Sequence, residues 1–229
     1  MVTHELRTPL TSIRSFSEIL LDNPDLDESE RAQYLRILVD EAERLTRLIN
    51  QVLDLSKIES GRAEWRIAEV DLKAVVEDSV ATTAQLFKEG HAALEVHVPA
   101  SVPPVAADRD RVMQVLLNLL SNAAKFCDRQ DGRVTVDLRV DGPGVRVDVR
   151  DNGPGIRPED QQVVFEKFRQ GGDALTDRPQ GTGLGLPISR QIVSHLGGEL
   201  WVESEPGQGA TFSFTLPVAQ APVGTEAAS

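Results

Sequence analysis

The chain has 229 residues, 40% of them hydrophobic, so it can form one large or two ordinary domains, and no run reaches the roughly 18 to 20 apolar residues of a membrane span. Its formal net charge of −12 argues against binding to nucleic acid, and the spacing of its four histidines does not fit a zinc site. A single cysteine, Cys127, excludes an internal disulfide and fits a reducing compartment, so we expect a soluble, cytoplasmic chain.

The first predicted element is a helix that runs to about Leu21, where Asp22-Asn23-Pro24 stops it. His4 and Thr8 are four residues apart, so they are neighbours on one face, and Glu5 lies beside that face. A carboxylate there can hold the proton of one ring nitrogen and leave the other free to attack a phosphoryl group. An apolar stripe lies away from this face, made of Leu6, Leu10, Ile13 and Leu20. A lone exposed histidine is usually just a solvated side chain, so the pattern predicts a nucleophile only together with what surrounds it.

A second helix is predicted after Asp27, which with Glu30 forms a capping box, and it ends near Ser60. Its apolar residues repeat at three and four, like a heptad: Leu35, Leu38, Ala42, Leu45, Ile49 and Val52. Two such helices cannot cover each other's apolar seams, so we expect a four-helix bundle formed by two chains. Met1 and Val2 are typical of a helix interior, so we expect a fragment of a longer protein that dimerises more weakly than its parent.

The pattern changes after Gly61-Arg62 to alternating strands and helices, so we place a domain boundary near residue 62 and expect domains at 1–62 and 63–217. The second domain is predicted to begin with a short strand at Trp65 and Ile67, a helix that Asp71 caps and Gly90 ends, and a strand at 94–98. A helix at about 109–126 and a hairpin of the strands 134–140 and 145–149 follow. The last predicted elements are a helix after Leu186 and a hairpin of the strands 200–202 and 211–216. We expect residues 218–229 to be a disordered tail.

Polar residues interrupt the Leu-rich helix at about 109–126. Asn118, Asn122 and Lys125 are four and three residues apart, so they share a face. Amide oxygens suit Mg²⁺, a hard cation that also takes phosphate oxygens. The amides alone are equally typical of a solvated helix face.

Two glycine-containing stretches follow strands or precede a helix. In Asp151-Asn152-Gly153-Pro154-Gly155, a carboxylate at a strand end can accept a hydrogen bond from an amino group such as that of adenine. Gly181-Thr182-Gly183-Leu184-Gly185-Leu186 precedes a helix, where backbone amides can cradle phosphate, although it fits neither the Walker nor the Rossmann pattern. Residues 170–180, polar and glycine-containing, are predicted to form a mobile lid. Gly207 and Gly209, with Thr211, are alone typical of a hairpin turn.

The run His4-Glu5-Leu6-Arg7-Thr8-Pro9-Leu10 resembles the phosphoacceptor box of sensor histidine kinases of two-component systems. In the same order as in that family, the other stretches resemble the N, G1, F (164–168), G2 and G3 boxes of its catalytic domain, which belongs to the ATPase superfamily of gyrase B, Hsp90 and MutL. The resemblance implies an α+β chain: a helical hairpin and an α/β sandwich whose mixed sheet carries helices on one face.

The resemblance also implies roles for single residues. Asn122 is expected to ligate Mg²⁺, with Asn118 and Lys125 helping to hold metal and phosphates, and Asp151 is expected to bind adenine. Arg169 is expected to reach the γ-phosphate. The other residues expected at the nucleotide are Gly153, Gly155, Lys167, Thr182, Gly183, Leu184, Gly185 and Thr211.

We therefore expect ATP-dependent autophosphorylation of His4, with Glu5 as proton acceptor, followed by transfer to an aspartate of a response regulator receiver domain. Thr8 is expected to serve in removing phosphate from the regulator. We expect a homodimer that contacts neither nucleic acid nor membrane, and the residues leave open whether the parent protein is membrane-anchored. The alternatives are an ATP-hydrolysing clamp, which would need a glutamate where Asn118 stands, and a non-catalytic ATP-binding scaffold, which the complete set of chemical residues disfavours.

Overall fold

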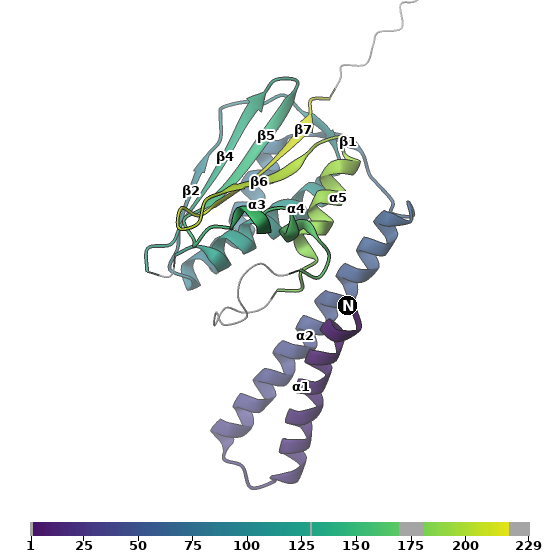
Figure 1. Ribbon diagram of the computed structural model, residues 1–229, viewed down its shortest axis with the longest axis vertical. Coiled ribbons are helices and arrows are strands. Elements are labelled where there is room, and N and C mark those ends of the chain that lie inside the picture. The colour runs from purple at the N-terminus through teal and green to yellow at the C-terminus, as the bar shows by residue number, and fades with distance from the viewer. Residues whose placement is uncertain (1, 129, 170–180, 220–229) are drawn as a thin grey trace, which may run out of the picture.

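A computed structural model describes residues 2–128, 130–169 and 181–219, with side chains from Glu5 onward. The chain forms a long helical hairpin that projects from an α/β sandwich (Figure 1). No described helix combines the length and the apolar character needed to cross a membrane.

The hairpin consists of α1 (Val2–Asp22) and α2 (Glu28–Glu59), which pack along each other. Asp27 caps α2 as predicted, because its carboxylate accepts a hydrogen bond of 2.8 Å from the Glu30 amide. The two helices leave large apolar side chains of the predicted seams in solvent: Leu10, Leu35 and Ile49 are 58, 49 and 43% exposed. The prediction that one hairpin cannot cover both seams is confirmed.

The sandwich consists of one five-stranded sheet with three helices on one face (Figure 1). The strand order is β2 (Ala93–His97), β4 (Arg133–Asp141), β5 (Gly144–Asp151), β7 (Ala210–Pro217) and β6 (Leu200–Ser204). Only the pair β2 and β4 is parallel, so the sheet is mixed. The helices are α3 (Leu72–Glu89), α4 (Arg109–Phe126) and α5 (Gly185–His195). The fold class expected from the resemblance is confirmed.

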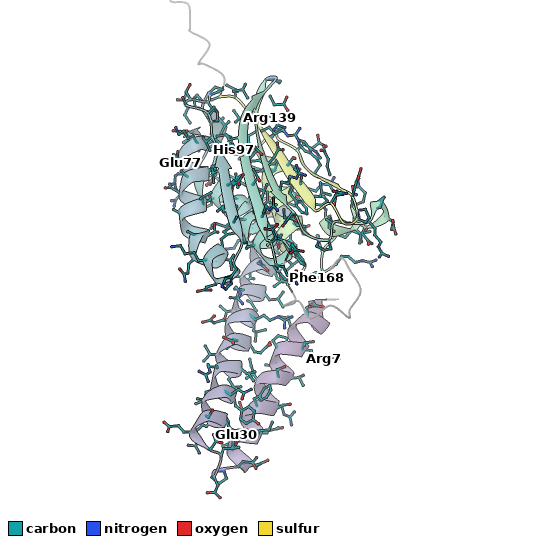
Figure 2. The ribbon with its side chains drawn as sticks, turned by 90° about the vertical axis from the view of Figure 1, so that its left-hand side faces the viewer. Arg7, Glu30, Glu77, His97, Arg139 and Phe168 are labelled. Carbon is teal, nitrogen blue, oxygen red and sulfur yellow. The ribbon has the colours of Figure 1, made fainter. Side chains whose placement is uncertain are left out.

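Strict alternation of apolar and polar residues decides which sheet face the helices cover. Val134, Val136 and Leu138 of β4 are buried, as are the alternate valines of β5, whereas charged side chains occupy the outer face. Asp148 on that outer face is paired with Arg139 and Arg146. Figure 2 shows His97 and Arg139 on the part of the sandwich away from the hairpin and Phe168 at the end that faces it.

Aspartates cap the helices of the sandwich. Asp71 accepts hydrogen bonds from the first turn of α3, and Asp108 does the same for α4. Asp108 also accepts a hydrogen bond of 2.8 Å from the Arg66 amide, so the cap of α4 anchors the segment that follows the hairpin. Two short 3₁₀ turns, η1 (Pro158–Asp160) and η2 (Val163–Phe165), lie between β5 and α5.

The first strand of the sandwich was predicted too early. Trp65 does not begin a strand: its ring stacks on His195 at a centroid distance of 3.8 Å, and the strand β1 is Ala68–Val70. β1 pairs with β3 (Val105–Ala107), a segment without an alternating apolar pattern. The propensity of an aromatic residue for strands was overridden by a contact with a distant helix.

The ordered chain extends past the predicted start of the tail. Val218 forms a bridge with Val105, and the Ala219 amide donates a hydrogen bond of 2.8 Å to the Pro104 carbonyl oxygen. The expectation of disorder from Val218 is therefore wrong for these two residues, because they continue the pairing of β7 toward β3. The rest of the predicted tail, 220–229, lies outside the described residues.

Candidate active site

The first turn of α1 contains His4, and the expected exposure of its ring lies outside the described side chains. Glu5 is half-buried and Thr8 is exposed. A shallow pocket of about 360 Å³ begins one turn after His4 and is lined by Arg7, Thr8, Thr11, Ser12, Ser15 and Phe16. The hydroxyl groups of α1 thus face an open concavity beside the predicted phosphoacceptor.

The polar face of α4 lies against the glycine stretch 181–185. A Cβ atom added to Gly185 would lie 2.1 Å from Asn118 Oδ1, and one added to Gly181 would lie 3.6 Å from Lys125 Nζ. Gly185 therefore has no room for a side chain, since Asn118 occupies that space. The structure brings together two of the stretches that the sequence placed in the nucleotide site.

Asn122 lies between these two residues on α4 and is half-buried. Among the described residues, none makes a hydrogen bond to its side-chain amide. No cluster of three or more His, Cys, Asp or Glu that could hold a metal occurs in the described part of the chain. An amide oxygen on this face of α4 fits Mg²⁺, which takes few protein ligands and fills its shell with phosphate oxygens and water.

Asp151 ends β5 and is 5% exposed. Its Oδ1 accepts a hydrogen bond of 2.8 Å from the Gly153 amide. A Cβ atom at Gly153 would lie 2.1 Å from the Phe126 carbonyl oxygen, so this loop contacts the end of α4 directly. The buried carboxylate and the helix with Asn122 and Lys125 thereby belong to one site.

The turn between β6 and β7 packs against the loop that follows Asp151. Cβ atoms at Gly155 and Gly209 would lie 2.1 Å from the Glu205 carbonyl oxygen and 1.9 Å from the Asp151 carbonyl oxygen. Thr211 follows on β7, half-buried and paired with Arg150. The contacts of Gly207, Gly209 and Thr211 are therefore with strand β5 and the loop that follows it.

The glycine stretch leads into α5 without a side-chain cap. Gly183 has φ +66° and its carbonyl oxygen accepts a hydrogen bond of 2.9 Å from the Phe168 amide. Leu184 is fully buried, so its contribution to the site is through its backbone. With no side-chain cap on α5, the amides of its first turn suit an anion.

Three side chains expected at the nucleotide are engaged with other residues here. Lys167 forms an ion pair with Glu59 of α2, and Arg169 Nε lies 3.3 Å from Glu166 Oε2. The Thr182 hydroxyl donates to the Gln51 side chain of α2. The Thr182 hydroxyl must leave Gln51 before it can donate to phosphate, whereas Lys167 and Arg169 have further N–H groups besides those that face the carboxylates. The predicted lid, 170–180, lies outside the described residues.

Sequence reasoning missed side chains that position the site. Asn152 Oδ1 accepts hydrogen bonds from the Asp128 and Arg133 amides at 3.2 and 2.9 Å, which joins the loop after α4 to the end of β5. Ser189 of α5 accepts a hydrogen bond of 3.0 Å from Asn118 Nδ2. The position of Asn152 inside the quoted Asp-Asn-Gly run was a usable signal, whereas nothing in the sequence pointed to Ser189.

Two family profiles match the chain. Residues 1–61 match the His Kinase A (phospho-acceptor) domain, and residues 107–220 match the Histidine kinase-, DNA gyrase B-, and HSP90-like ATPase domain. The first covers the whole hairpin, and the second covers α4, the Asp151 loop and the glycine stretch.

Whole proteins and solved structures show the same similarity. Drug sensory protein A of Synechocystis sp. is 39% identical over 230 residues, which cover 96% of this chain and 34% of that protein. ShkA in complex with AMPPNP is 32% identical, with a TM-score of 0.72 over 95% of this chain and 45% of that one. The histidine kinase ThkA in complex with the response regulator protein TrrA is 26% identical, with a TM-score of 0.74 over 95% of this chain and 60% of that one. The chain spans between a quarter and about a third of the length of these curated relatives.

Proposed function

The chain belongs to the sensor histidine kinases of two-component systems, and from this we propose that it phosphorylates its own His4 with ATP and passes the phosphoryl group to an aspartate of a response regulator. The observation that carries the proposal is the approach of Asn118 and Lys125 on α4 to the glycine stretch 181–185, with Asp151 buried at the end of β5 and followed by a loop that contacts the last residue of α4. This arrangement supplies an adenine acceptor, a cation and backbone amides within one site.

The chemistry at His4 is a displacement at phosphorus. The lone pair of one ring nitrogen forms a bond to the γ-phosphorus, the bond from that phosphorus to the bridging oxygen breaks, and its electrons leave with ADP. Glu5 is the neighbour that takes the proton from the other ring nitrogen, which keeps the phosphorylated ring neutral. Catalysis then depends mainly on positioning and on charge neutralisation around the phosphates.

The proposed nucleotide contacts follow the geometry of the site. Asp151 accepts a hydrogen bond from the adenine amino group, and Gly153 and Gly155 let the backbone approach the ring. Asn122 ligates Mg²⁺, which when bound supplies positive charge at the phosphates, and Lys125 lies beside it. The remaining residues proposed at the phosphates or the ends of the lid are Asn118, Lys167, Arg169, Thr182, Gly183, Leu184, Gly185 and Thr211. The complex of ShkA with AMPPNP supports a nucleotide of this class.

The proposed partner is a response regulator receiver domain, and the proposed assembly is a homodimer. The complex of ThkA with TrrA supports the first, because that kinase aligns over 95% of this chain. The pocket on α1 offers hydroxyl groups and Arg7 beside the phosphoacceptor. The exposed apolar residues Leu10, Val39 and Leu53 support the homodimer, because the hairpin of another copy of the chain would cover them.

An ATP-hydrolysing clamp is the less favoured function. Such an enzyme needs a carboxylate to activate water, and Asn118 stands on α4 where the clamp ATPases have that base. A neutral amide does not accept the proton of an attacking water. The site therefore suits transfer to a protein acceptor better than hydrolysis.

The proposed function is tested by labelling the chain with radioactive Mg-ATP. Phosphate is expected on His4, labile in acid and stable in alkali, and His4→Gln should abolish it. His97→Gln is the matched control: it should incorporate as much phosphate as the wild type, since His97 lies on the outer part of the sandwich. Full labelling of His4→Gln would contradict the proposal.

A further inference from the structure

The hydroxyl of Ser189 lies between α4 and α5. Ser189 is 1% exposed, and its Oγ accepts a hydrogen bond of 3.0 Å from Asn118 Nδ2. A hydroxyl buried among apolar residues is costly unless it has a partner, and Asn118 is the partner that the structure provides. The pair links the core of the helix layer to the polar face of α4.

Gly185 lies one helical turn before Ser189 and contacts the Asn118 side-chain amide on its other side. The position of a Cβ atom on Gly185 is 2.1 Å from Asn118 Oδ1 and 3.1 Å from Asn118 Nδ2. The amide is therefore oriented with its nitrogen toward Ser189 and its oxygen toward Gly185. The group that Asn118 presents at the first turn of α5 is an acceptor.

An acceptor at this place suits one kind of neighbour. A carbonyl oxygen repels phosphate oxygens, whereas it accepts hydrogen bonds from an ammonium group or from a water in the shell of a metal. Reversed, the amide would present a donor toward the phosphates. In the structure Asn118 Nδ2 donates to the Ser189 hydroxyl, which leaves Oδ1 toward Gly185, and this direction of the amide decides what Asn118 does in the site.

We propose that Ser189 is a positioning residue for autophosphorylation: it holds the Asn118 amide so that Oδ1 faces the glycine stretch and accepts a hydrogen bond from water on the nucleotide-bound Mg²⁺. The inference rests on the proposed function, because it takes the glycine stretch as the phosphate site. Ser189 touches neither nucleotide nor metal and acts through Asn118 alone.

Removal of the hydroxyl should affect turnover and spare nucleotide affinity. Without its anchor the amide rotates, and the loss of one oriented hydrogen bond lowers the rate by up to about tenfold. The loop after Asp151 contacts Phe126, about two helical turns along α4 from Asn118, so the proposed adenine contact should be unchanged and the dissociation constant for ATP should move less than about twofold. A general loss of structure would instead weaken both.

The experiment compares Ser189→Ala, Asn118→Ala and the double variant in the full chain, with rate and ATP affinity measured separately. Ser79→Ala is the matched control, because Ser79 is a fully buried serine on α3 whose hydroxyl donates to the Val75 carbonyl oxygen. The double variant should be no slower than Asn118→Ala alone, since Ser189 acts through that residue.

A second measurement does not depend on activity. In the nucleotide-free wild type, nuclear magnetic resonance should show slower solvent exchange of the Asn118 side-chain amide protons than of those of Asn50, which is exposed on α2. Ser189→Ala should accelerate the exchange at Asn118, and Ser79→Ala should not. Equal exchange at Asn118 and Asn50 in the wild type would overturn the proposal even if Ser189→Ala failed to fold.

The outcomes separate this proposal from the proposed function. A wild-type rate in Ser189→Ala beside a slowed Asn118→Ala, or additive effects in the double variant, would overturn the role of Ser189 and leave the kinase function intact. Absence of phosphate on His4 in the wild type would contradict the proposed function itself.

Discussion

The Thr182 hydroxyl donates a hydrogen bond of 2.6 Å to Gln51 Oε1 and so joins the glycine stretch of the sandwich to helix α2 of the hairpin. Asp54, one turn further along α2, accepts hydrogen bonds of 2.7 Å from Arg111 and 2.9 Å from Gln114 of α4. Leu55, on the same helix, is buried against the sandwich. The two parts of the chain are thus held together through Thr182 of the glycine stretch and through the first half of α4.

Loss of the Asp54 carboxylate should loosen this connection. Asp54 and Arg111 are only 21 and 20% exposed, so Asp54→Ala leaves a largely buried guanidinium without its partner, at a cost of about 1–3 kcal/mol. Calorimetry should show the hairpin and the sandwich melting in two separated transitions instead of one. Glu18→Ala, which breaks the exposed pair with Arg14, should leave the melting curve unchanged. A single unaltered transition in Asp54→Ala would show that the contact does not couple the parts.

Asp151→Asn should abolish ATP binding while the fold is retained. An amide can turn a donor toward the adenine amino group, and two donors repel each other. Titration calorimetry measures the affinity, and circular dichroism checks the fold. Asp148→Asn is the matched control: it lies on the same strand with the same 5% exposure but faces the opposite side of the sheet, so it should lower stability and keep ATP binding. Unchanged affinity in Asp151→Asn would refute the adenine site.

Thr8→Ala should keep autophosphorylation and lose the ability to remove phosphate from the regulator. The hydroxyl lies one turn from His4, where it can orient a water for attack on an aspartyl phosphate. The assay follows release of phosphate from a purified phosphorylated receiver domain. Thr11→Ala, which lines the same pocket, serves as the control. Equal loss of both activities in Thr8→Ala would mean that the residue is structural.

The hairpin should dimerise with a dissociation constant in the micromolar range. Burial of apolar surface contributes roughly 25 cal/mol per Å², and the exposed seam residues of α1 and α2 supply that surface. Val39→Glu should shift the chain to monomer in sedimentation at a series of concentrations. Val140→Glu, at a side chain of similar exposure on the sheet, should not. A wild-type chain that remains monomeric at high micromolar concentration would rule out the bundle.

The regular elements of this fold were accessible from sequence because each carries a local signal. The boundaries of α2 and α3 follow from Asp27 and Asp71, whose capping geometry the structure contains. The alternating valines of β4 and β5 indicate both the strands and the buried face. These signals need only a few neighbouring residues, so they survive without knowledge of the tertiary structure.

The parts that were missed depend on distant partners. β3 is a strand through its pairing with β1, and Trp65, which belongs to no strand, stacks on His195, more than a hundred residues away. The orientation of Asn118 depends in the same way on Ser189, and Lys167 on Glu59. Composition and periodicity contain no information about such pairs, so the types of the site residues were predictable and their contacts were not.

The register between β5 and β7 has a consequence for how the chain folds. Asp151 pairs with Ala210 and Gly144 with Pro217, although the glycine stretch and α5 lie between the two strands in the chain. The two strands can therefore pair only after the chain between them has returned β7 to the side of β5. The helices α1 and α2 follow one another in the chain and close through a short turn, so their mutual contacts are more local than the pairing of β5 with β7. Since non-local pairing slows folding, we expect refolding in two phases, with helical signal from the hairpin first and nucleotide-binding competence in the slower one. A newly synthesised chain would therefore present its phosphoacceptor helix before it can use ATP.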